Sequence, residues 1–241
     1  MSKNILIIAA MEEELKPFIS DGDYKRTDDA PFAFYTGKMG DHSLLLSVSK
    51  IGLVSMGSCA EHFLTRVKYD DSIPFSSIDM VMNIGVGGAI SSELEQGDIV
   101  VGNRLCQHDM DVTGLGYEIG LNPDYSSVYH DADTAALDAI ERAYEKLDTD
   151  YRLRTGTIAS GDAFISSKEK KDFIEKTFSA LACEMEGSAL AQVCSDNKVP
   201  FLVIRAISDK ADGEAPLSYN DFKEKAILNL TELVKMTIGE L

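Results

Sequence analysis

The sequence has few basic residues and no long apolar run, and each shortage argues against a class of partner. Only 23 Lys and Arg stand against 40 Asp and Glu, so the formal net charge is -17. At that charge, long-range repulsion opposes the approach of nucleic acid or of an anionic membrane, and neither is expected as a partner. A small polar substrate remains compatible with this charge.

The apolar run at residues 4–10 is too short to cross a bilayer, and acidic residues follow it at once. It lacks the features of a signal peptide and of a membrane anchor. We therefore expect a cytoplasmic protein.

Cysteine is scarce as well, with four residues and no close pair, so reduced thiols are expected. Cys183 and Cys194 are eleven residues apart, which on a helix with a rise of about 1.5 Å per residue is about 16 Å. A disulfide requires Cα atoms within about 7 Å of each other. Cys106 and His108 could begin a metal site, but no second pair with ligand spacing follows, so no bound metal is expected.

Apolar runs alternate with amphipathic patterns, without an internal repeat, a low-complexity segment or a linker, which predicts one α/β domain over residues 1–241. Strands are predicted at residues 4–10, 32–36, 43–49, 78–83, 98–102, 152–159 and 201–206, the second and third joined in a hairpin. Helices are predicted at residues 52–67, 131–147, 168–178, 186–197 and 219–238, and another begins after Met11. The last helix should follow a loop at residues 210–216 and bury Phe222, Ala226, Leu230 and Leu233.

Acidic residues border the helix and the strand predicted within residues 181–209. Glu184 and Glu186 flank the start of the helix, and Asp209 follows the apolar strand. In open α/β sheets ligands gather at the carboxyl ends of strands, so Asp209 is a candidate site residue. The alternative reading is that the glutamates suit the helix dipole and that Asp209 caps a turn. The spacing alone leaves both readings open.

Two further patterns follow predicted strands. Met11 precedes three acids, residues 12–14, which suit the positive end of a helix dipole. The glycine-rich segment at residues 85–88 is not followed by a clear helix start, so a dinucleotide-binding fingerprint is not expected. We expect these glycines to let the backbone approach a ligand closely.

Six separated motifs run along the chain: IAAMEEE, GVGG, HDMDVTGLGY, SGDAFI, EMEGSA and RAISD. Together they resemble the 5′-methylthioadenosine/S-adenosylhomocysteine nucleosidase family of the nucleoside phosphorylase/nucleosidase superfamily, over essentially the whole chain. The resemblance implies a mixed central β-sheet flanked by helices. It also implies hydrolysis of the N-glycosidic bond of these adenine nucleosides, without a cofactor.

The resemblance assigns roles to three acids. Glu14, the third acid of IAAMEEE, corresponds to the base that activates water. Related phosphorylases hold phosphate near this place with basic and glycine residues, and a carboxylate there would repel phosphate, which favours hydrolysis. Asp209 is the expected acid that protonates N7 of the leaving adenine. Glu186 should accept hydrogen bonds from the ribose hydroxyls and stabilise the positive charge of the oxocarbenium-like transition state.

Other expected contacts surround the nucleoside. Phe164 should stack on adenine, the backbone of Ile165 should read the base edge, and Arg205 should pair with a nearby carboxylate. Val86 stands where serine is common in the family, so backbone contacts are expected there. The expected substrate contacts beyond the three acids are Met11, Val86, Gly87, Phe164, Ile165, Glu184, Met185, Arg205 and Ser208.

The segment at residues 108–117 is expected at the interface of a homodimer. In the family it lends apolar side chains to the neighbour's pocket for the 5′ substituent. Val112, Leu115 and Pro123 match those positions, with Leu115 where an aromatic residue is common. The alternative is an ordinary turn-rich loop.

Three other functions remain compatible with these motifs. A phosphorylase of the same fold would require phosphate. A nucleosidase for a futalosine-type nucleoside or for AMP would prefer another substrate. A non-enzymatic nucleoside-binding module would bind a nucleoside without releasing adenine.

Overall fold

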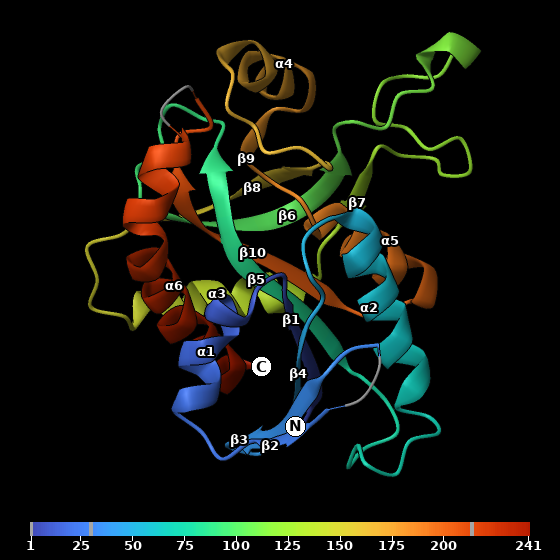
Figure 1. Cartoon of the computed structure of the whole chain (residues 1–241), viewed down its shortest axis with the longest axis vertical. Coiled ribbons are helices and arrows are strands. Elements are labelled where there is room, and N and C mark those ends of the chain that lie inside the picture. Colours follow the sequence, from blue (N-terminus) through green and yellow to red (C-terminus); the bar gives the residue numbers. More distant parts are fainter. Residues whose placement is uncertain (1, 29–30, 213–214) are drawn as a thin grey trace.

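The computed structural model describes residues 2–28, 31–212 and 215–241, with the backbone alone for residues 216–221. The described strands form one ten-stranded mixed sheet, which is flanked by helices (Figure 1). The architecture is therefore the α/β class with a mixed central sheet that the sequence predicts.

Five strands close into a ring. They are β5 (Met80–Ala89), β6 (Ile99–Gln107), β8 (Leu153–Ser160), β9 (Ala180–Glu184) and β10 (Phe201–Asp209). β5 pairs with β10 and β9, β6 pairs with β10 and β8, and β8 pairs with β9. Each of these strands thus has two neighbours in the ring, so the positions of their ends are fixed relative to one another.

Four strands extend the sheet from β5. Their order is β1 (Asn4–Ala9), β4 (His42–Val48), β3 (Phe34–Met39) and β2 (Lys25–Thr27), while the short β7 (Tyr129–Asp131) pairs with β6. β3 and β4 form the predicted hairpin. Its turn contains Gly40, whose φ of 56° is left-handed and suits glycine.

Helices lie on both sides of the sheet. α1 (Glu12–Ser20), α3 (Thr134–Glu145) and α6 (Ala215–Glu240) pack together on one side, and α2 (Leu53–Arg66) packs against α5 (Gly187–Asn197) on the other (Figure 1). α4 (Lys168–Phe178) packs against β8 and β9. Residues 108–127, which we call the arm, project from the body and carry the short 3₁₀ helix η1 (Thr113–Leu115) (Figure 1).

Local signals explain where several elements begin and end. All nine residues of β10 are buried, as expected for an apolar strand covered on both faces. Asp133 caps α3 by accepting a hydrogen bond from Ala136 N at 2.9 Å, and Ser167 caps α4 in the same way. Ser179 directly follows α4 and Lys198 directly follows α5, and both adopt the left-handed conformation that closes many helices.

The strands differ from the prediction in several respects, and β6 and β10 run five and three residues past their predicted ends. β2, β7 and β9 were not predicted, because runs of three to five residues are too short to display an alternating pattern. The glycine-rich segment at residues 85–88 lies inside β5 rather than after a strand, because β10 and β9 pair with β5 there.

The last helix also differs. α6 begins at Ala215, so the predicted loop at residues 210–216 is too long. Pro216 is compatible with a first helical turn, since the N–H of that turn has no intrahelical acceptor. Phe222 is 38% exposed and does not point inward, whereas Ala226, Leu230 and Leu233 are buried as predicted.

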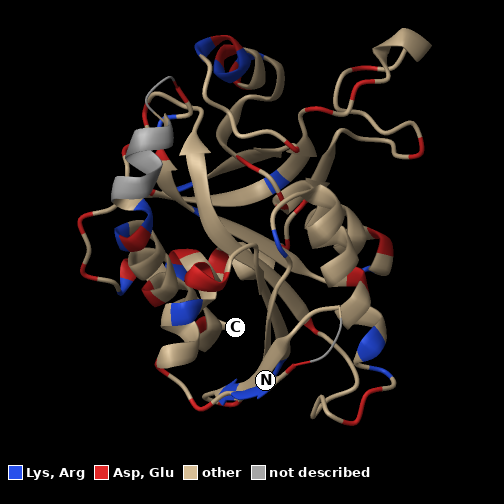
Figure 2. Ribbon diagram, in the orientation of Figure 1, with Lys and Arg blue, Asp and Glu red and all other residues tan. Residues whose placement is uncertain are grey.

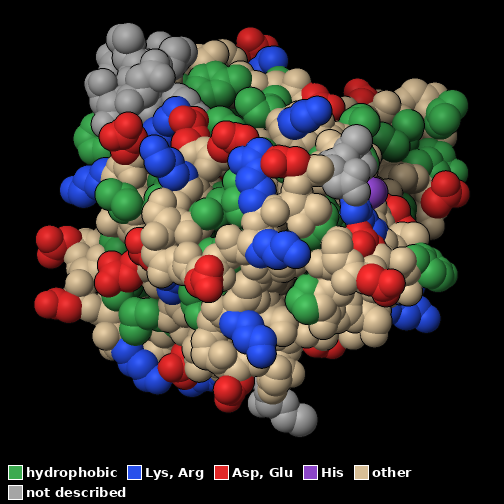
Figure 3. All heavy atoms as spheres, turned by 60° about the horizontal axis from the view of Figure 1, so that its bottom comes forward, with side chains coloured by type: hydrophobic (Ala, Val, Ile, Leu, Met, Phe, Trp, Pro, Cys, Tyr) green, Lys and Arg blue, Asp and Glu red, His purple; other side chains and the backbone are tan. Residues whose placement is uncertain are grey.

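The surface carries its negative charge in a dispersed form. Acidic residues recur on many helices and loops (Figure 2), and on the face seen in Figure 3 acidic, basic and hydrophobic side chains are interspersed. Within the described ranges, no helix is long and apolar enough to cross a membrane. The four cysteines are free and buried.

Candidate active site

A cavity of about 410 Å³ opens where several strands end. It lies beyond the carboxyl ends of β1, β4, β8 and β9 and along the last residues of β5 and β10, the place where α/β sheets bind ligands. The described residues that line it are Ala10, Met11, Glu14, Ile51, Val86, Gly87, Gly88, Ala163, Phe164, Ile165, Cys183, Glu184, Met185, Glu186, Ser208 and Asp209.

The structure brings together the three predicted acids and every predicted substrate contact except Arg205. Sequence reasoning missed five lining residues: Ala10, Ile51, Gly88, Ala163 and Cys183. Four of them are direct neighbours of residues that were predicted, so a wider reading of each motif would have found them. Ile51 lies outside every motif, and only the fold brings it to the cavity.

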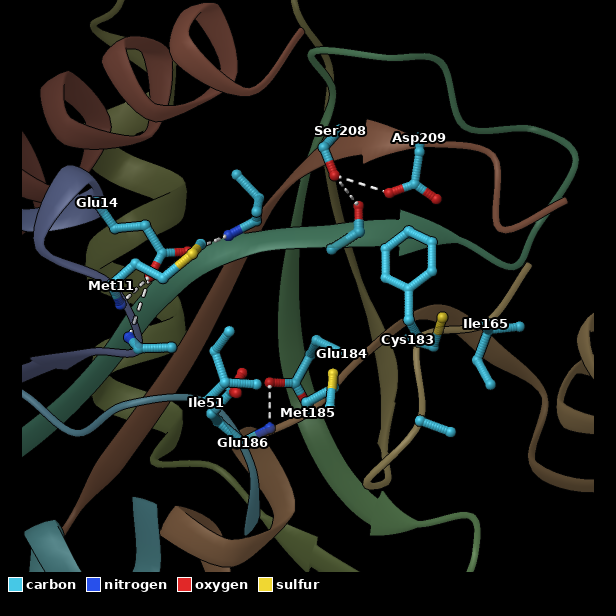
Figure 4. Close-up of a pocket in the computed structure, with 16 residues that line it drawn as sticks. Met11, Glu14, Ile51, Ile165, Cys183, Glu184, Met185, Glu186, Ser208 and Asp209 are labelled. Atoms are coloured by element: carbon cyan, nitrogen blue, oxygen red, sulfur yellow. Dashed lines mark hydrogen bonds between the residues drawn. The ribbon is translucent and has the colours of Figure 1, made fainter. Parts of the chain in front are cut away.

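The three acids face the cavity from separate elements (Figure 4). Glu14 lies with Met11 at one end, where α1 begins, and Asp209 lies with Ser208 at the other end, where β10 stops. Glu186 approaches from the start of α5. A molecule that fills the cavity therefore has carboxyl groups on more than one side.

Glu14 is held by backbone N–H groups just before its own helix and on β5. It is 3% exposed, and its Oε2 accepts hydrogen bonds from Ala10 N at 3.1 Å and Met11 N at 3.0 Å. Its Oε1 accepts from Val86 N at 3.1 Å, which links α1 to β5. Burial raises the pKa of Glu14, whereas the charge of Arg205 and these backbone N–H groups act in the opposite direction.

Glu184 and Arg205 form an ion pair beneath the cavity. Their side chains are 2% and 1% exposed. Glu184 also accepts backbone hydrogen bonds from Glu186 N at 3.0 Å and Gly187 N at 2.8 Å, and Arg205 donates to the carbonyl of Asn83 at 3.2 Å. Arg205 thus pairs with a carboxylate, as expected. It does not line the cavity, and its expected contact with substrate stays a prediction.

Glu186 lies directly before α5 and is 6% exposed. One carboxylate oxygen accepts from Gly52 N at 2.9 Å, and the other lies 3.9 Å from the Arg205 guanidinium. Burial, with a further contribution from the negative charge of Glu184, raises the pKa of Glu186 to about 7, and Arg205 opposes this shift. Near neutral pH this carboxyl group therefore changes protonation readily.

Asp209 ends β10 and is 2% exposed. Its Oδ1 accepts from Ala211 N and its Oδ2 from Ser208 Oγ, each at 2.9 Å. Burial raises the pKa of Asp209, whereas these two hydrogen bonds lower it. A raised pKa favours the protonated carboxyl group, which is the form that can donate a proton.

Two glycines of β5 make room for these carboxylates. A Cβ atom at Gly85 would lie 2.6 Å from Oε1 of Glu14, and one at Gly88 would lie 3.0 Å from Oδ1 of Asp209. Larger residues at either position would displace an acid from its place. In this structure the atoms nearest to these two glycines belong to side chains of the chain itself, and the close approach of a ligand stays a prediction.

The three residues predicted to serve a neighbouring subunit lie on the arm. Val112, Leu115 and Pro123 do not line the cavity of their own chain. Leu115 is 76% exposed and the nearby Tyr117 is 43% exposed, so the arm presents apolar surface to solvent. Their expected role concerns a second copy of the chain and stays a prediction.

No metal-binding group of at least three His, Cys, Asp or Glu side chains occurs in the part of the chain that the structure describes. Cys106, which the sequence placed near His108, packs instead in a small apolar cluster with Ile90 and Ala159. The acids of the cavity are held by Arg205 and by backbone N–H groups.

Known proteins resemble this chain over nearly its full length. A family model described as the phosphorylase superfamily matches residues 4–238. The 5′-methylthioadenosine/S-adenosylhomocysteine nucleosidase of Anoxybacillus flavithermus is 36% identical over 241 residues, covering 99% of each chain. The aminodeoxyfutalosine nucleosidase of Campylobacter jejuni is 35% identical over 219 residues, covering 90% of each chain.

A solved structure is also similar to this chain over its full length. The crystal structure of a 5′-methylthioadenosine/S-adenosylhomocysteine nucleosidase from Colwellia psychrerythraea, in complex with adenine, matches with a TM-score of 0.92. That protein is 32% identical, and the match covers 100% of this chain and 96% of the other.

The raised pKa of Glu186 predicts a pH-dependent cost in stability. Because its folded pKa of about 7 lies above the ordinary value of 4.5, the folded state retains a proton that the unfolded state releases between these pH values, and the free energy of unfolding falls as pH rises through that window. Glu186→Gln removes this pH-dependent contribution to the free energy of unfolding, which amounts to about 3 kcal/mol. Urea unfolding at pH 4.5 and pH 8 should show the variant gaining stability relative to wild type at the higher pH.

Glu175→Gln, on the exposed side of α4, is the matched control for a change from glutamate to glutamine. A Glu186→Gln effect that is the same at pH 4.5 and pH 8 would contradict the assignment.

Proposed function

The chain belongs to the phosphorylase superfamily, and from that premise we propose that it hydrolyses the N-glycosidic bond of 5′-methylthioadenosine and S-adenosylhomocysteine, releasing adenine and the 5′-thio-ribose. Residues 1–241 act as one domain in this proposal. The observation that carries it is the charge of the cavity. Its lining includes Glu14, Glu184, Glu186 and Asp209, and among the described residues no Lys or Arg lines it.

This charge favours water over phosphate as the nucleophile. A phosphate anion in the cavity would be desolvated next to carboxylates without a lining cation to pair with it. Arg205 lies beneath the cavity and is engaged by Glu184. Water carries no charge and meets no such barrier, so hydrolysis is the reaction that this site supports.

Glu14 is the proposed base for that water. Its carboxylate is fixed by three backbone N–H groups, so it can hold a water molecule in one place. Its raised pKa makes it a better proton acceptor than an ordinary glutamate, since the ideal base has a pKa near the working pH.

Asp209 is the proposed acid, protonating N7 of the leaving adenine. Adenine is a poor leaving group as an anion, and protonation removes that charge. Ser208 orients Asp209 through the 2.9 Å hydrogen bond to Oδ2. Phe164 and Ile165 line the cavity from the segment after β8 and are the proposed contacts of the base, by stacking and by backbone hydrogen bonds.

Glu186 is the proposed partner of the ribose. It lies across the cavity from Glu14 and Asp209 (Figure 4), where its carboxylate can accept hydrogen bonds from the ribose hydroxyls and stabilise the cationic transition state. Met11 and Met185 give that part of the cavity apolar walls, and Val86 and Gly87 line it from β5, with the Val86 N–H donated to Glu14. No cofactor is needed for these steps.

A second candidate substrate is an aminodeoxyfutalosine-type nucleoside. The observation that favours it is the 35% identity to the aminodeoxyfutalosine nucleosidase of Campylobacter jejuni. The same three acids would cleave its N-glycosidic bond, and the difference lies in the 5′ substituent.

The proposed active unit is a homodimer. Each arm would place Val112, Leu115 and Pro123 against the 5′ substituent in the neighbour's cavity. The support for this is the exposure of Leu115 on a segment that projects from the body (Figure 1). An apolar wall of this kind would favour a thioether and reject a 5′-phosphate, whose charge would lose its hydration.

Incubation of the protein with methylthioadenosine should release free adenine and the methylthio-sugar at the same rate with and without phosphate. Chromatography of both products measures this directly, and aminodeoxyfutalosine serves as the comparison substrate. A sugar 1-phosphate, or turnover that requires phosphate, would overturn hydrolysis.

Asp209→Asn should lower turnover of methylthioadenosine by about two to four orders of magnitude, the range that general acid–base catalysis supplies, with a smaller effect on binding.

Glu14→Gln should likewise abolish turnover while adenosine-like ligands still bind. Steady-state kinetics and calorimetric binding measure the two effects. Asp172→Asn, on α4 and paired with Lys168, is the control and should retain wild-type rates. Near-native turnover in either site variant would remove that residue from its role.

Leu115→Asp should raise the KM for methylthioadenosine and weaken the dimer together, because one side chain serves the interface and the neighbour's cavity. Sedimentation and steady-state kinetics report the two effects. Leu228→Asp makes the same change at a position of α6 that is 59% exposed, and should alter neither. A fully active monomer, with Leu115→Asp silent, would refute the shared pocket.

A further inference from the structure

The N-terminus of α2 holds two carboxylates, that of Glu186, which lines the cavity, and that of Asp162, which lies next to the lining residues 163–165. Gly52 N donates to Glu186 Oε1 at 2.9 Å, and Leu53 N donates to Asp162 Oδ1 at 2.9 Å. These are successive backbone N–H groups at the positive end of the helix dipole, where negative charge is stabilised. The residue directly before them, Ile51, lines the cavity.

Asp162 belongs to the segment at residues 161–165 that forms the proposed base-binding wall. The next three residues of that segment, Ala163, Phe164 and Ile165, all line the cavity, whereas Asp162 does not. Its own backbone N donates to Asp109 Oδ2 at 2.8 Å. The segment is therefore fastened on two sides, through the Asp162 side chain to α2 and through the Asp162 backbone to the start of the arm.

The fit at α2 is close. A Cβ atom at Gly52 would lie 3.0 Å from Asp162 Oδ1, and the φ of Gly52 is 102°, a value that favours glycine. The backbone at Gly52 thus admits the Asp162 carboxylate while turning its own N–H toward Glu186. Residues 51–53 thus contact both the 161–165 segment and Glu186.

We propose that Asp162 is a positioning residue for the nucleoside: its carboxylate, bound to the α2 N-terminus, holds residues 163–165 in the place from which they contact the base. The proposal rests on the proposed function, because it assigns the base to this wall. Asp162 does not touch the reacting atoms. Its loss therefore weakens binding of the base and leaves the chemical step largely intact.

The binding measurement compares wild type, Asp162→Ala and Asp162→Asn with adenine as the titrated ligand. Loss of this charge-assisted hydrogen bond at an exposed position should weaken adenine binding about tenfold in Asp162→Ala. Asp162→Asn keeps an acceptor oxygen without the charge and should fall between the two. Asp172→Ala, an acid of α4 that pairs with Lys168, is the control and should bind as wild type.

Kinetics and hydrogen exchange separate positioning from general stability. The KM for methylthioadenosine should rise about tenfold in Asp162→Ala while kcat stays within about threefold. Amide exchange in peptides that cover residues 51–56 and 161–166 should become faster without ligand. A variant that is only less stable would melt earlier with an unchanged KM, and that result would overturn the proposal.

The outcomes distinguish this inference from the proposed function. Wild type that binds adenine but does not release it from methylthioadenosine would refute the hydrolysis and leave the adenine titration as the test of Asp162. Wild-type adenine affinity in Asp162→Ala would refute the positioning role whatever the turnover. If Asp162→Ala does not fold, Asp109→Ala removes the other fastening of the same segment and should weaken adenine binding in the same direction.

Discussion

The buried ion pair between Glu184 and Arg205 is the interaction on which the acidic cavity depends. Glu14, Glu186 and Asp209 are each less than 7% exposed, and burial raises the pKa of all three. Arg205 places a positive charge beneath them, which opposes these shifts at Glu14 and at Glu186. Because Glu184 and the backbone of Asn83 hold the guanidinium, the charge stays beneath the cavity rather than in it. Arg205 thus offsets part of the negative charge of the cavity, although no cation is exposed to an anionic ligand there.

The closed ring of strands makes this arrangement possible. β5, β9 and β10 pair within one ring, so Val86, Glu184 and Asp209 reach the same cavity although they come from distant parts of the sequence. α1 joins them through the hydrogen bond from Val86 N to Glu14. Packing alone would tolerate larger residues along much of a strand, but β5 has glycine at the points where a Cβ would meet Glu14 or Asp209. The fold therefore positions the acids by backbone contacts more than by side-chain contacts.

The sequence predicted the fold class and most of the cavity lining, because long apolar strands and amphipathic helices leave strong patterns. It missed β9, a strand of five residues whose pairing with β5 and β8 is a non-local choice. It listed Arg205 among the substrate contacts, whereas the Arg205 side chain pairs with Glu184 and does not line the cavity. A sequence motif does not show toward which face of a strand a side chain points. Ile51 and Asp162 show the same limit: Ile51 lies outside every motif, and Asp162 lies inside one without a local sign of its contact with α2.

The same physics links the cost of this site to its proposed chemistry. Burying carboxylates in one cavity disfavours their ionised forms, which is why their pKa values rise. A neutral nucleoside would not reduce this free-energy cost of ionising buried carboxylates, because it brings no positive charge to replace their lost hydration. A ribosyl cation, which forms as the glycosidic bond breaks, would offset it at Glu186 and at Glu14 together. In the proposed reaction the cavity is therefore more complementary to the transition state than to the substrate, and only that difference speeds the chemical step.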